Sequence, residues 1–399
     1  DRIPEAELGQ CSLYAMMLFN REWTKYRKGK PTLISIEGPC LSRVAPGALT
    51  ERQSLDYHMR SLLILSANGV NRLLASVDGH AENQSYWGEQ HYGNGGYSRI
   101  TLNPHPVIAA EATFIRLLRD CEFVHTVPTG SLGVFALEFR NVNTGKPLHV
   151  MWTVCGRVPF TAKGGRLTDA MDNPKAKREL SPEPVFLEEA QGEIAFGKQV
   201  FDEADANPSA DSAEVADLAE WTQVVEPGED GYLNSFPADI RRFPCEMSVS
   251  NCAGKLSVAL RDDSPDRGIM PVFTTLVPPR PVALPGRPAK LALETTAVAD
   301  WGRVVFVLED AKGERFISVG GKGVYNSDDT PYASYFTFEG RRMIRMELPV
   351  THPWDGFRGM GYVWWGHSGG DGVVDYPLSV VKVHVERRKR VLHANELVD

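Results

Sequence analysis

The sequence has no long apolar run, no cluster of positive charge and no closely spaced cysteine pair. No stretch approaches the roughly 18 apolar residues that a membrane-spanning helix needs, so we expect no membrane span. The formal net charge is −8, and the basic run at 386–390 is typical of a solvated strand face, so no nucleic-acid partner is expected. No Cys-x-x-Cys spacing occurs, so no zinc site is expected either.

The six cysteines are scattered and leave the cellular compartment open. Cys245 and Cys252 could pair across a hairpin if the protein is exported, whereas burial statistics favour free buried thiols. The chain begins with Asp1 and shows no signal peptide, from which we expect a processed protein or a fragment. Its 399 residues, 42% hydrophobic and 24% charged, are ordinary for a soluble globular protein of two or three domains.

The first part of the chain alternates between helix-like and strand-like patterns. Apolar residues recur at helical spacing in residues 4–28, 50–68 and 106–119. Two apolar runs, 32–37 and 70–77, have the length of buried strands, and Asn68-Gly69 is a helix stop signal between them. Helices that alternate with buried strands predict βα units of a parallel sheet, and therefore an α/β fold here.

The remainder has the pattern of an all-β protein. Short apolar runs separated by turn residues predict antiparallel strands at 133–140, 148–154, 184–187, 255–260, 289–295, 303–308, 316–319, 343–348 and 380–385. Residues 190–230 are acidic and rich in Ala, Ser and Asp, which predicts a connector. The density of short strands after residue 231 predicts a β-sandwich of the jelly-roll type.

Several motifs occur in an order typical of one enzyme group. Gly29-Lys30-Pro31 leads into an apolar strand that ends in Glu37. The later motifs are Asn68-Gly69-Val70, the segment 103–106, the segment 167–174 and the segment 180–187. Together they resemble the last quarter of the (β/α)₈ barrel, and the small β-sandwich after it, of clan A glycoside hydrolases similar to family 39. In that clan a glutamate at the end of strand seven is the nucleophile.

The resemblance implies a division of the chain. Residues 1–128 would be the C-terminal part of a TIM-barrel-like glycoside hydrolase domain, with strands seven and eight only. Residues 129–189 would be the small attached β-sandwich, 190–230 the acidic connector, and 231–399 a jelly-roll sandwich that could bind carbohydrate. Strands one to six have no counterpart, so either a second chain supplies them or the chain is a truncated product with another arrangement.

Retaining glycosidases use two carboxyl groups about 5–5.5 Å apart. The resemblance implies that Glu37 is the nucleophile; the alternative is a strand-end glutamate in a surface salt bridge. The clan's acid/base lies in an Asn-Glu pair after strand four. The Asn-Glu pair of this chain, Asn395-Glu396, lies at the opposite end of the sequence, so the acid/base is not assigned.

The loop after the second strand carries the residue types that bind sugars. Aromatic rings stack on sugar faces, and carboxylates and imidazoles bond hydroxyl groups; Trp87 is the best stacking candidate. The substrate-binding candidates are Asp78, His80, Trp87, Glu89, His91 and Tyr92. The alternative is a glycine-rich loop packed on itself. His80 and His91 have no clear third partner, so neither a metal nor another cofactor is expected.

The last segment holds a second group of candidates. Its possible glycan-binding residues are Asp328, Asp329, Trp354, Trp364 and Trp365. Core tryptophans beside an aspartate-containing turn are the commoner explanation. Adjacent residues of a strand face opposite sides, so one of Trp364 and Trp365 should be buried, and Trp301 should be buried beside a strand start.

The sequence therefore predicts a hydrolase, or its C-terminal part, that cleaves glycosidic bonds of a poly- or oligosaccharide. A secreted or periplasmic location fits this class of function. The alternative is a non-catalytic carbohydrate-binding or structural β-sandwich protein with a degenerate barrel remnant. Sugar, linkage and anomer stay open.

Overall fold

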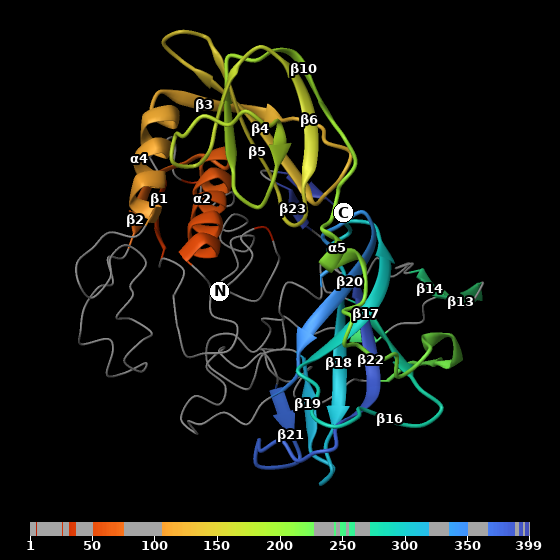
Figure 1. The fold of residues 1–399 in the computed structure, drawn as a ribbon. Helices are drawn as coiled ribbons and strands as arrows, with labels where there is room; N and C mark the ends of the chain where they lie inside the picture. The colour runs from red at the N-terminus through yellow and green to blue at the C-terminus, as the bar shows by residue number, and fades with distance from the viewer. Residues whose placement is uncertain are drawn as a thin grey trace.

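The structure is a computed structural model. It describes residues 5, 26, 32–36, 51–75, 106–226, 243–244, 248–252, 255–259, 272–318, 335–349, 366–387, 391–393 and 396–398. Within these residues an α/β unit is followed by mostly antiparallel sheets (Figure 1), so the chain is α/β at its start and β-rich beyond. None of the described helices is both long and apolar enough to cross a membrane.

The α/β unit consists of two parallel strands and two helices. Strand β1 (Thr32–Ile36) pairs in parallel with β2 (Val70–Ala75), and helix α2 (Glu51–Ala67) connects them in sequence. Helix α4 (Pro106–Leu118) follows and packs against α2. The predicted alternation of helices and strands is confirmed at these four elements, whereas the predicted helix at 4–28 lies outside the described residues apart from Glu5 and Tyr26.

Helix α2 ends where its stop signal predicts. The side chain of Asn68 donates a hydrogen bond to the carbonyl of Ile64 at 2.8 Å, which satisfies one of the free carbonyls of the last turn. Gly69 follows with φ 78°, a left-handed conformation that glycine adopts at little cost. The chain then turns directly into β2.

A five-stranded antiparallel sheet packs on α2. Its strands, in spatial order, are β3 (Cys121–Thr126), β4 (Val134–Asn141), β5 (Pro147–Thr153), β9 (Val185–Glu188) and β7 (Arg166–Thr168). Both faces are buried at the centre, which explains the nearly continuous apolar sequence of β4. Phe135 and Leu137 join the cluster that includes α2, and Val134 and Ala136 point to the other face.

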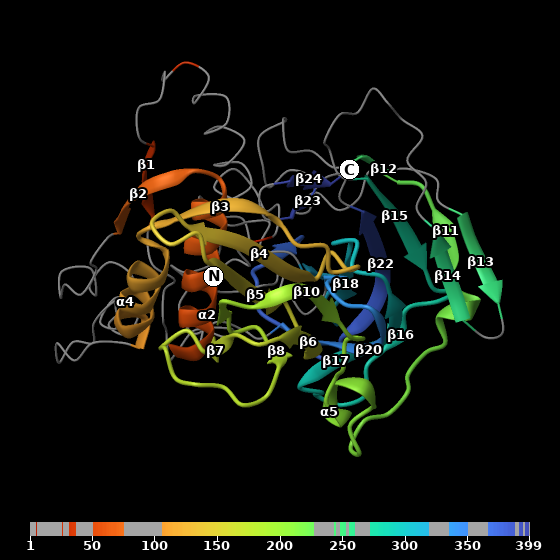
Figure 2. The same cartoon turned by 90° about the horizontal axis from the view of Figure 1, so that it is seen from above.

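The second face is covered by a three-stranded sheet with the order β10 (Gln191–Phe196), β6 (Val158–Lys163) and β8 (Glu179–Leu180). Phe160, Leu180 and Ile194 fill the space between the two sheets. The five-stranded sheet is therefore the middle layer between the helices and the three-stranded sheet. Figure 2 shows β4 and β5 passing over α2.

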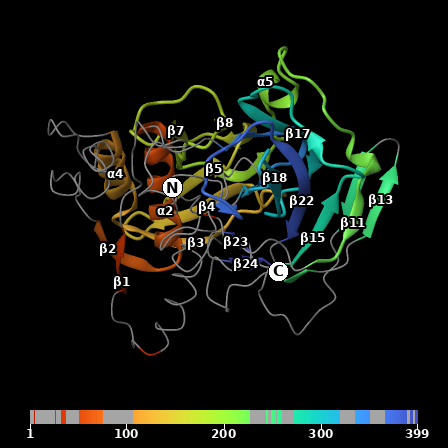
Figure 3. The same ribbon diagram turned by 90° about the horizontal axis from the view of Figure 1, so that it is seen from below.

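The C-terminal half is built on an eight-stranded sheet. Its central path runs β11 (Thr222–Val224), β15 (Val272–Val277), β22 (Ser379–Arg387), β18 (Arg303–Glu309), β19 (Arg315–Ile317) and β21 (Gly366–Ser368). Two short strands complete it: β12 (Phe243–Pro244), parallel to β15, and β16 (Val282–Ala283), antiparallel to β22. Figure 3 shows β15, β22 and β18 side by side.

A two-stranded sheet of β17 (Lys290–Ala297) and β20 (Gly340–Glu347) packs on the large sheet through one apolar cluster. Alternate residues of β17 are exposed, as expected of a strand with one solvated face. The remaining elements are the hairpin β13 (Ser248–Cys252) and β14 (Lys255–Ala259), the hairpin β23 (Val391–His393) and β24 (Glu396–Val398), helix α5 (Glu203–Ala206) and the 3₁₀ turn η1 (Leu218–Glu220). The nine strands predicted between 133 and 385 all overlap observed strands.

The two halves share a core. Trp301, two residues before β18, is 1% exposed, which confirms its predicted burial. Its ring makes an edge-to-face contact with Phe135, with the centroids 6.5 Å apart. Its Nε1 donates a hydrogen bond to the carbonyl of Leu132 at 3.0 Å. Close by, a Cβ on Gly133 would lie 2.3 Å from the carbonyl oxygen of Thr337, so only glycine permits this approach.

One prediction about the C-terminal run is wrong at its first residue. Glu386 was expected on a solvated face, but it is fully buried in β22, where its carboxylate pairs with buried Arg303 at 3.0 Å. In a buried ion pair of this kind, the attraction between the two charges offsets the free energy lost by desolvation only when both charges are held in contact. Cys121 and Cys155 are free thiols. Whether Cys245 pairs with Cys252, the alternative to free thiols, is not tested, because Cys245 lies outside the described residues.

The finer architectural predictions stay predictions: the partial (β/α)₈ barrel, the jelly-roll topology and the four segment boundaries. The segment 190–230 contributes β10 and β11 to two sheets, besides α5 and η1. Among the described residues the parallel sheet has two strands.

Candidate functional site

The two parallel strands end at the edge of the sheet where the catalytic residues are predicted, and the predicted residues themselves lie outside the described part of the chain. In the register of the parallel pair, Ile36 lies beside Ala75, so the chain leaves β1 and β2 at the same edge of the sheet. Glu37 is the next residue after Ile36 in the sequence, and the loop with the sugar-binding candidates follows Ala75. The predicted site residues that lie outside the described part of the chain are Glu37, Asp78, His80, Trp87, Glu89, His91, Tyr92, Asp328, Asp329, Trp354, Trp364 and Trp365.

Within the described residues, a cavity of about 310 Å³ lies between α2 and the segment that joins β8 to β9. Helix α2 contributes Arg52, Asp56 and Arg60, which are spaced four residues apart and therefore lie on one face. Pro182 and Glu183 line the opposite wall. The N-terminal part of α2 thus presents charged side chains to the cavity, whereas the C-terminal part of the helix is mostly apolar and buried.

The mouth of the cavity holds a network of alternating charges. Arg52, half-exposed, contacts Asp56 through Nε and Oδ1 at 3.3 Å and also pairs with the Oε2 of Glu183. Lys175 Nζ lies 3.5 Å from the same Oε2. The carboxyl groups of Asp56 and Glu183 are both more than nine-tenths buried.

The floor is held by a buried trio that joins α2 to the N-terminal residues and to β5. Arg60 Nε is 2.9 Å from Glu5 Oε1, which also accepts a hydrogen bond from Trp152 Nε1 at 2.8 Å. All three side chains are at most 1% exposed. Arg60 also lies over the ring of Tyr57, 4.8 Å from its centroid, and donates to the carbonyl of Pro182 at 3.4 Å.

Burial raises the pKa of Asp56 from 3.8 to about 6. Desolvation is the largest cause, and the negative charge of Glu183 acts in the same direction. The positive charges of Arg52 and Arg60 oppose the shift without cancelling it. Asp56 is therefore a carboxyl group that changes charge in the mildly acidic range.

Two buried polar atoms of this cavity, Glu183 Oε1 and Arg60 Nη2, have no hydrogen-bond partner among the described residues. Asp56 Oδ1 has the contact with Arg52 Nε at 3.3 Å but accepts no hydrogen bond. Buried polar groups are nearly always hydrogen-bonded, so these exceptions indicate that water or a ligand completes the site.

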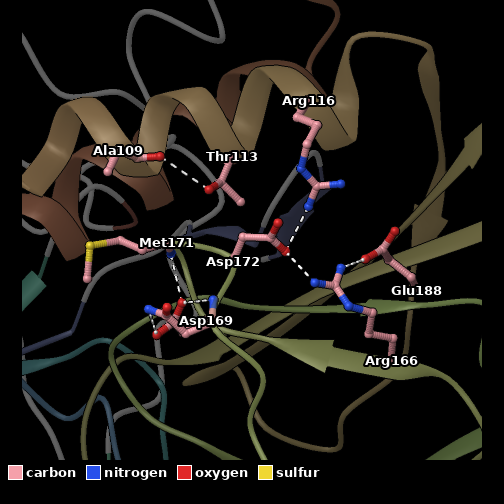
Figure 4. A network of polar contacts seen from close by, with 9 residues as sticks. Ala109, Thr113, Arg116, Arg166, Asp169, Met171, Asp172 and Glu188 are labelled. Carbon is pink, nitrogen blue, oxygen red and sulfur yellow. Dashed lines mark hydrogen bonds and ion pairs between the residues drawn. The ribbon is translucent and has the colours of Figure 1, made fainter.

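The motif at 167–174 has a structural role in the described fold (Figure 4). Asp169 accepts hydrogen bonds from the backbone of Met171 and Asn173, both at 2.9 Å, and so fixes the turn. Asp172, at φ 67°, pairs with Arg116 of α4 at 2.8 Å and with Arg166 of β7 at 3.0 Å. The turn thus ties α4 to the five-stranded sheet.

No group of three metal-binding side chains occurs within the described ranges. The carboxylate of Glu138 lies 3.8 Å from His125 Nε2 and 3.7 Å from His149 Nε2, which is long for a direct hydrogen bond. Burial lowers the pKa of His149 and favours its neutral form.

The cavity residues were not predicted from the sequence. A signal was present, because Asp56, His58 and Arg60 are three ionisable residues within five positions of one helix, and they are spread around it so that they could not all reach solvent. Such charges need partners inside the protein. Their partners, Glu5 and Glu183, are distant in sequence and gave no pattern to follow.

Comparison with known proteins adds little to this picture. No family model and no curated protein matches the chain. A solved structure described as a family 39 glycoside hydrolase from the gut symbiont Bacteroides cellulosilyticus WH2 aligns over 39% of this chain at 18% identity, with a TM-score of 0.29. The alignment spans 32% of that protein's chain. The likeness is distant, and no activity is transferred from it.

Proposed function

We propose that this chain is the C-terminal part of a retaining glycoside hydrolase in which Glu37 is the nucleophile. The observation that supports this assignment is the parallel pairing of β1 and β2 with α2 between them. In βα barrels, catalytic groups follow the carboxyl ends of parallel strands, and Glu37 directly follows β1.

The register of β1 and β2 also locates the start of the predicted substrate-binding loop. Because Ile36 and Ala75 are paired, the loop that follows β2 starts at the same edge of the sheet at which β1 ends. Under the proposal, Asp78, His80, Trp87, Glu89, His91 and Tyr92 bind the sugar from this loop. Trp87 would stack on the ring, and the polar groups would bond its hydroxyls.

In the proposed reaction the Glu37 carboxylate attacks the anomeric carbon and forms a glycosyl ester, which water then hydrolyses. A second carboxyl group protonates the leaving oxygen and later activates the water. Glu396 is not suited to that role, because it begins β24 of an antiparallel hairpin rather than following a parallel strand. The acid/base would belong to the barrel strands that have no counterpart in this sequence, and it is not assigned.

The nucleophile can be tested without the acid/base. A 2,4-dinitrophenyl 2-deoxy-2-fluoroglycoside has a leaving group that needs no protonation, so Glu37 alone should form a trapped ester. We expect one equivalent of dinitrophenolate and a mass adduct on the peptide that contains Glu37. Glu37→Gln should abolish both, and the control Glu188→Gln, altered at an exposed ion pair of the five-stranded sheet, should not.

An adduct on another carboxylate, or release unchanged in Glu37→Gln, would refute the assignment. Absence of any adduct, with folding verified by circular dichroism, would favour the alternative of a non-catalytic carbohydrate-binding or structural protein. The observation behind this alternative is that the parallel sheet has two strands in the described part of the chain, whereas antiparallel sheets make up most of the rest. Its glycan-binding candidates are Asp328, Asp329, Trp354, Trp364 and Trp365.

A further inference from the structure

The cavity beside α2 has a donor and acceptor pattern that identifies its ligand class. Glu183 Oε1 is an acceptor without a hydrogen-bond partner, and Arg60 Nη2 is a donor without one. Asp56 Oδ1 has the ion-pair contact with Arg52 at 3.3 Å and accepts no hydrogen bond, so it can accept a further donor. The three side chains are at least nine-tenths buried, so bulk water does not replace the missing partners. A group that can donate and accept at once satisfies both kinds of atom, and a hydroxyl is such a group.

The balanced charge of the side chains around the cavity disfavours ionic ligands. An anion would meet the carboxylates of Asp56 and Glu183, and a cation would meet the guanidinium groups of Arg52 and Arg60. The positive side chains near the cavity, with Lys175, are already matched by Glu5, Asp56 and Glu183 within the described residues. Adding net charge to such a buried, balanced set would cost desolvation with no compensating partner.

We propose that this cavity is a binding site for a neutral polyhydroxylated molecule of the size of one sugar ring. Vicinal hydroxyl groups would donate to the carboxylates of Asp56 and Glu183 and accept from Arg60. Val154 and Pro182 supply apolar surface for the C–H groups of the ligand.

The volume supports a single ring. A cavity of about 310 Å³ is at the lower end of the roughly 300–1,000 Å³ range of small-molecule pockets. A longer glycan could bind only by its terminal unit. The proposal does not depend on the function proposed for Glu37, because the cavity is lined by residues of α2, by the 181–183 segment and by Val154, which follows β5.

The test uses the full chain and isothermal titration calorimetry at neutral pH with D-glucose, D-xylose, xylitol and glycerol. We expect saturable binding in the millimolar range for at least one of them. The cyclic and acyclic probes distinguish a sugar ring from a free polyol as the source of the hydroxyls. Preference for xylitol or glycerol would assign the site to free polyols, and preference for the cyclic sugars would assign it to a sugar unit.

Isosteric variants locate the binding. Asp56→Asn and Glu183→Gln keep the shape of the side chains but remove the charge-assisted hydrogen bonds, and each should weaken binding about tenfold. The matched control Glu188→Gln should bind as the unaltered chain does. Glu37→Gln should also leave this affinity unchanged, so failure of the two proposals can be told apart.

Three results would overturn the proposal: no saturable binding of any probe up to about 100 mM, a concentration at which millimolar sites are filled; binding that both amide variants leave unchanged; or tighter binding of inorganic phosphate or acetate than of the polyols. Circular dichroism of each variant establishes that loss of binding is not loss of fold. A crystal structure soaked in the best probe that shows water alone in the cavity would equally refute the assignment.

Discussion

Replacing Asp56 by asparagine should stabilise the protein at neutral pH. The fold raises the pKa of Asp56 from 3.8 to about 6, so the folded chain holds this proton more tightly than the unfolded chain does. As pH rises from 3.8 through 6, the wild-type chain therefore loses stability, and above that range the loss is complete. The difference between 3.8 and about 6 corresponds to roughly 3 kcal/mol. Asparagine has the same shape and no charge, so Asp56→Asn avoids this cost.

The assay is urea denaturation of wild type and variant at about pH 4 and about pH 8. The free energies of unfolding should be similar at the lower pH, and the variant should be more stable by a few kcal/mol at the higher. Asp211→Asn, an exposed aspartate between α5 and η1, is the matched control and should show no such pH dependence. A variant that is destabilised at the higher pH would mean that the ion pair with Arg52 outweighs burial, and the reasoning would fail.

Two further substitutions test the contacts that hold the layers together. Gly133→Ala should destabilise the chain by about 1–3 kcal/mol or more, because its Cβ would lie 2.3 Å from the carbonyl oxygen of Thr337; a thermal shift near zero would show that the halves are not in close contact there. Trp152→Phe should cost about 2–4 kcal/mol in urea denaturation, since it removes the hydrogen bond to buried Glu5 and part of a core ring; an unchanged midpoint would contradict this buried trio.

The sequence predicted the helices and strands that are determined by residues close together in the chain. Helical spacing located α2 and α4, and Asn68-Gly69 located the end of α2 because the asparagine caps a carbonyl and the glycine takes a left-handed turn. Alternation and apolar runs located β4, β5 and six of the thirteen strands described after residue 231, and they missed the buried strand β15. Trp301 was expected to be buried, because the C-terminal segment holds several large tryptophan rings and some of them must pack inward; the side chain is 1% exposed.

Features that depend on contacts between residues far apart in the sequence could not be predicted from local patterns. Strand β11 is three residues long and lies in an acidic segment, and it becomes a strand only because β15 offers an edge. The burial of Glu386 depends on Arg303 in another strand, although its own neighbours in sequence are basic. The charged cavity likewise depends on Glu5 and Glu183 meeting the same helix.

The position of Trp301 restricts how the two halves can move. The residue belongs to the C-terminal half, yet its indole is enclosed in the apolar cluster of the N-terminal half. A hinge rotation that separated the halves would withdraw this ring and expose roughly 200 Å² of it, at a cost of about 5 kcal/mol. A separated state would therefore be populated in roughly one molecule in several thousand. A ligand that opened the halves would have to bind the open form more tightly by about the same 5 kcal/mol.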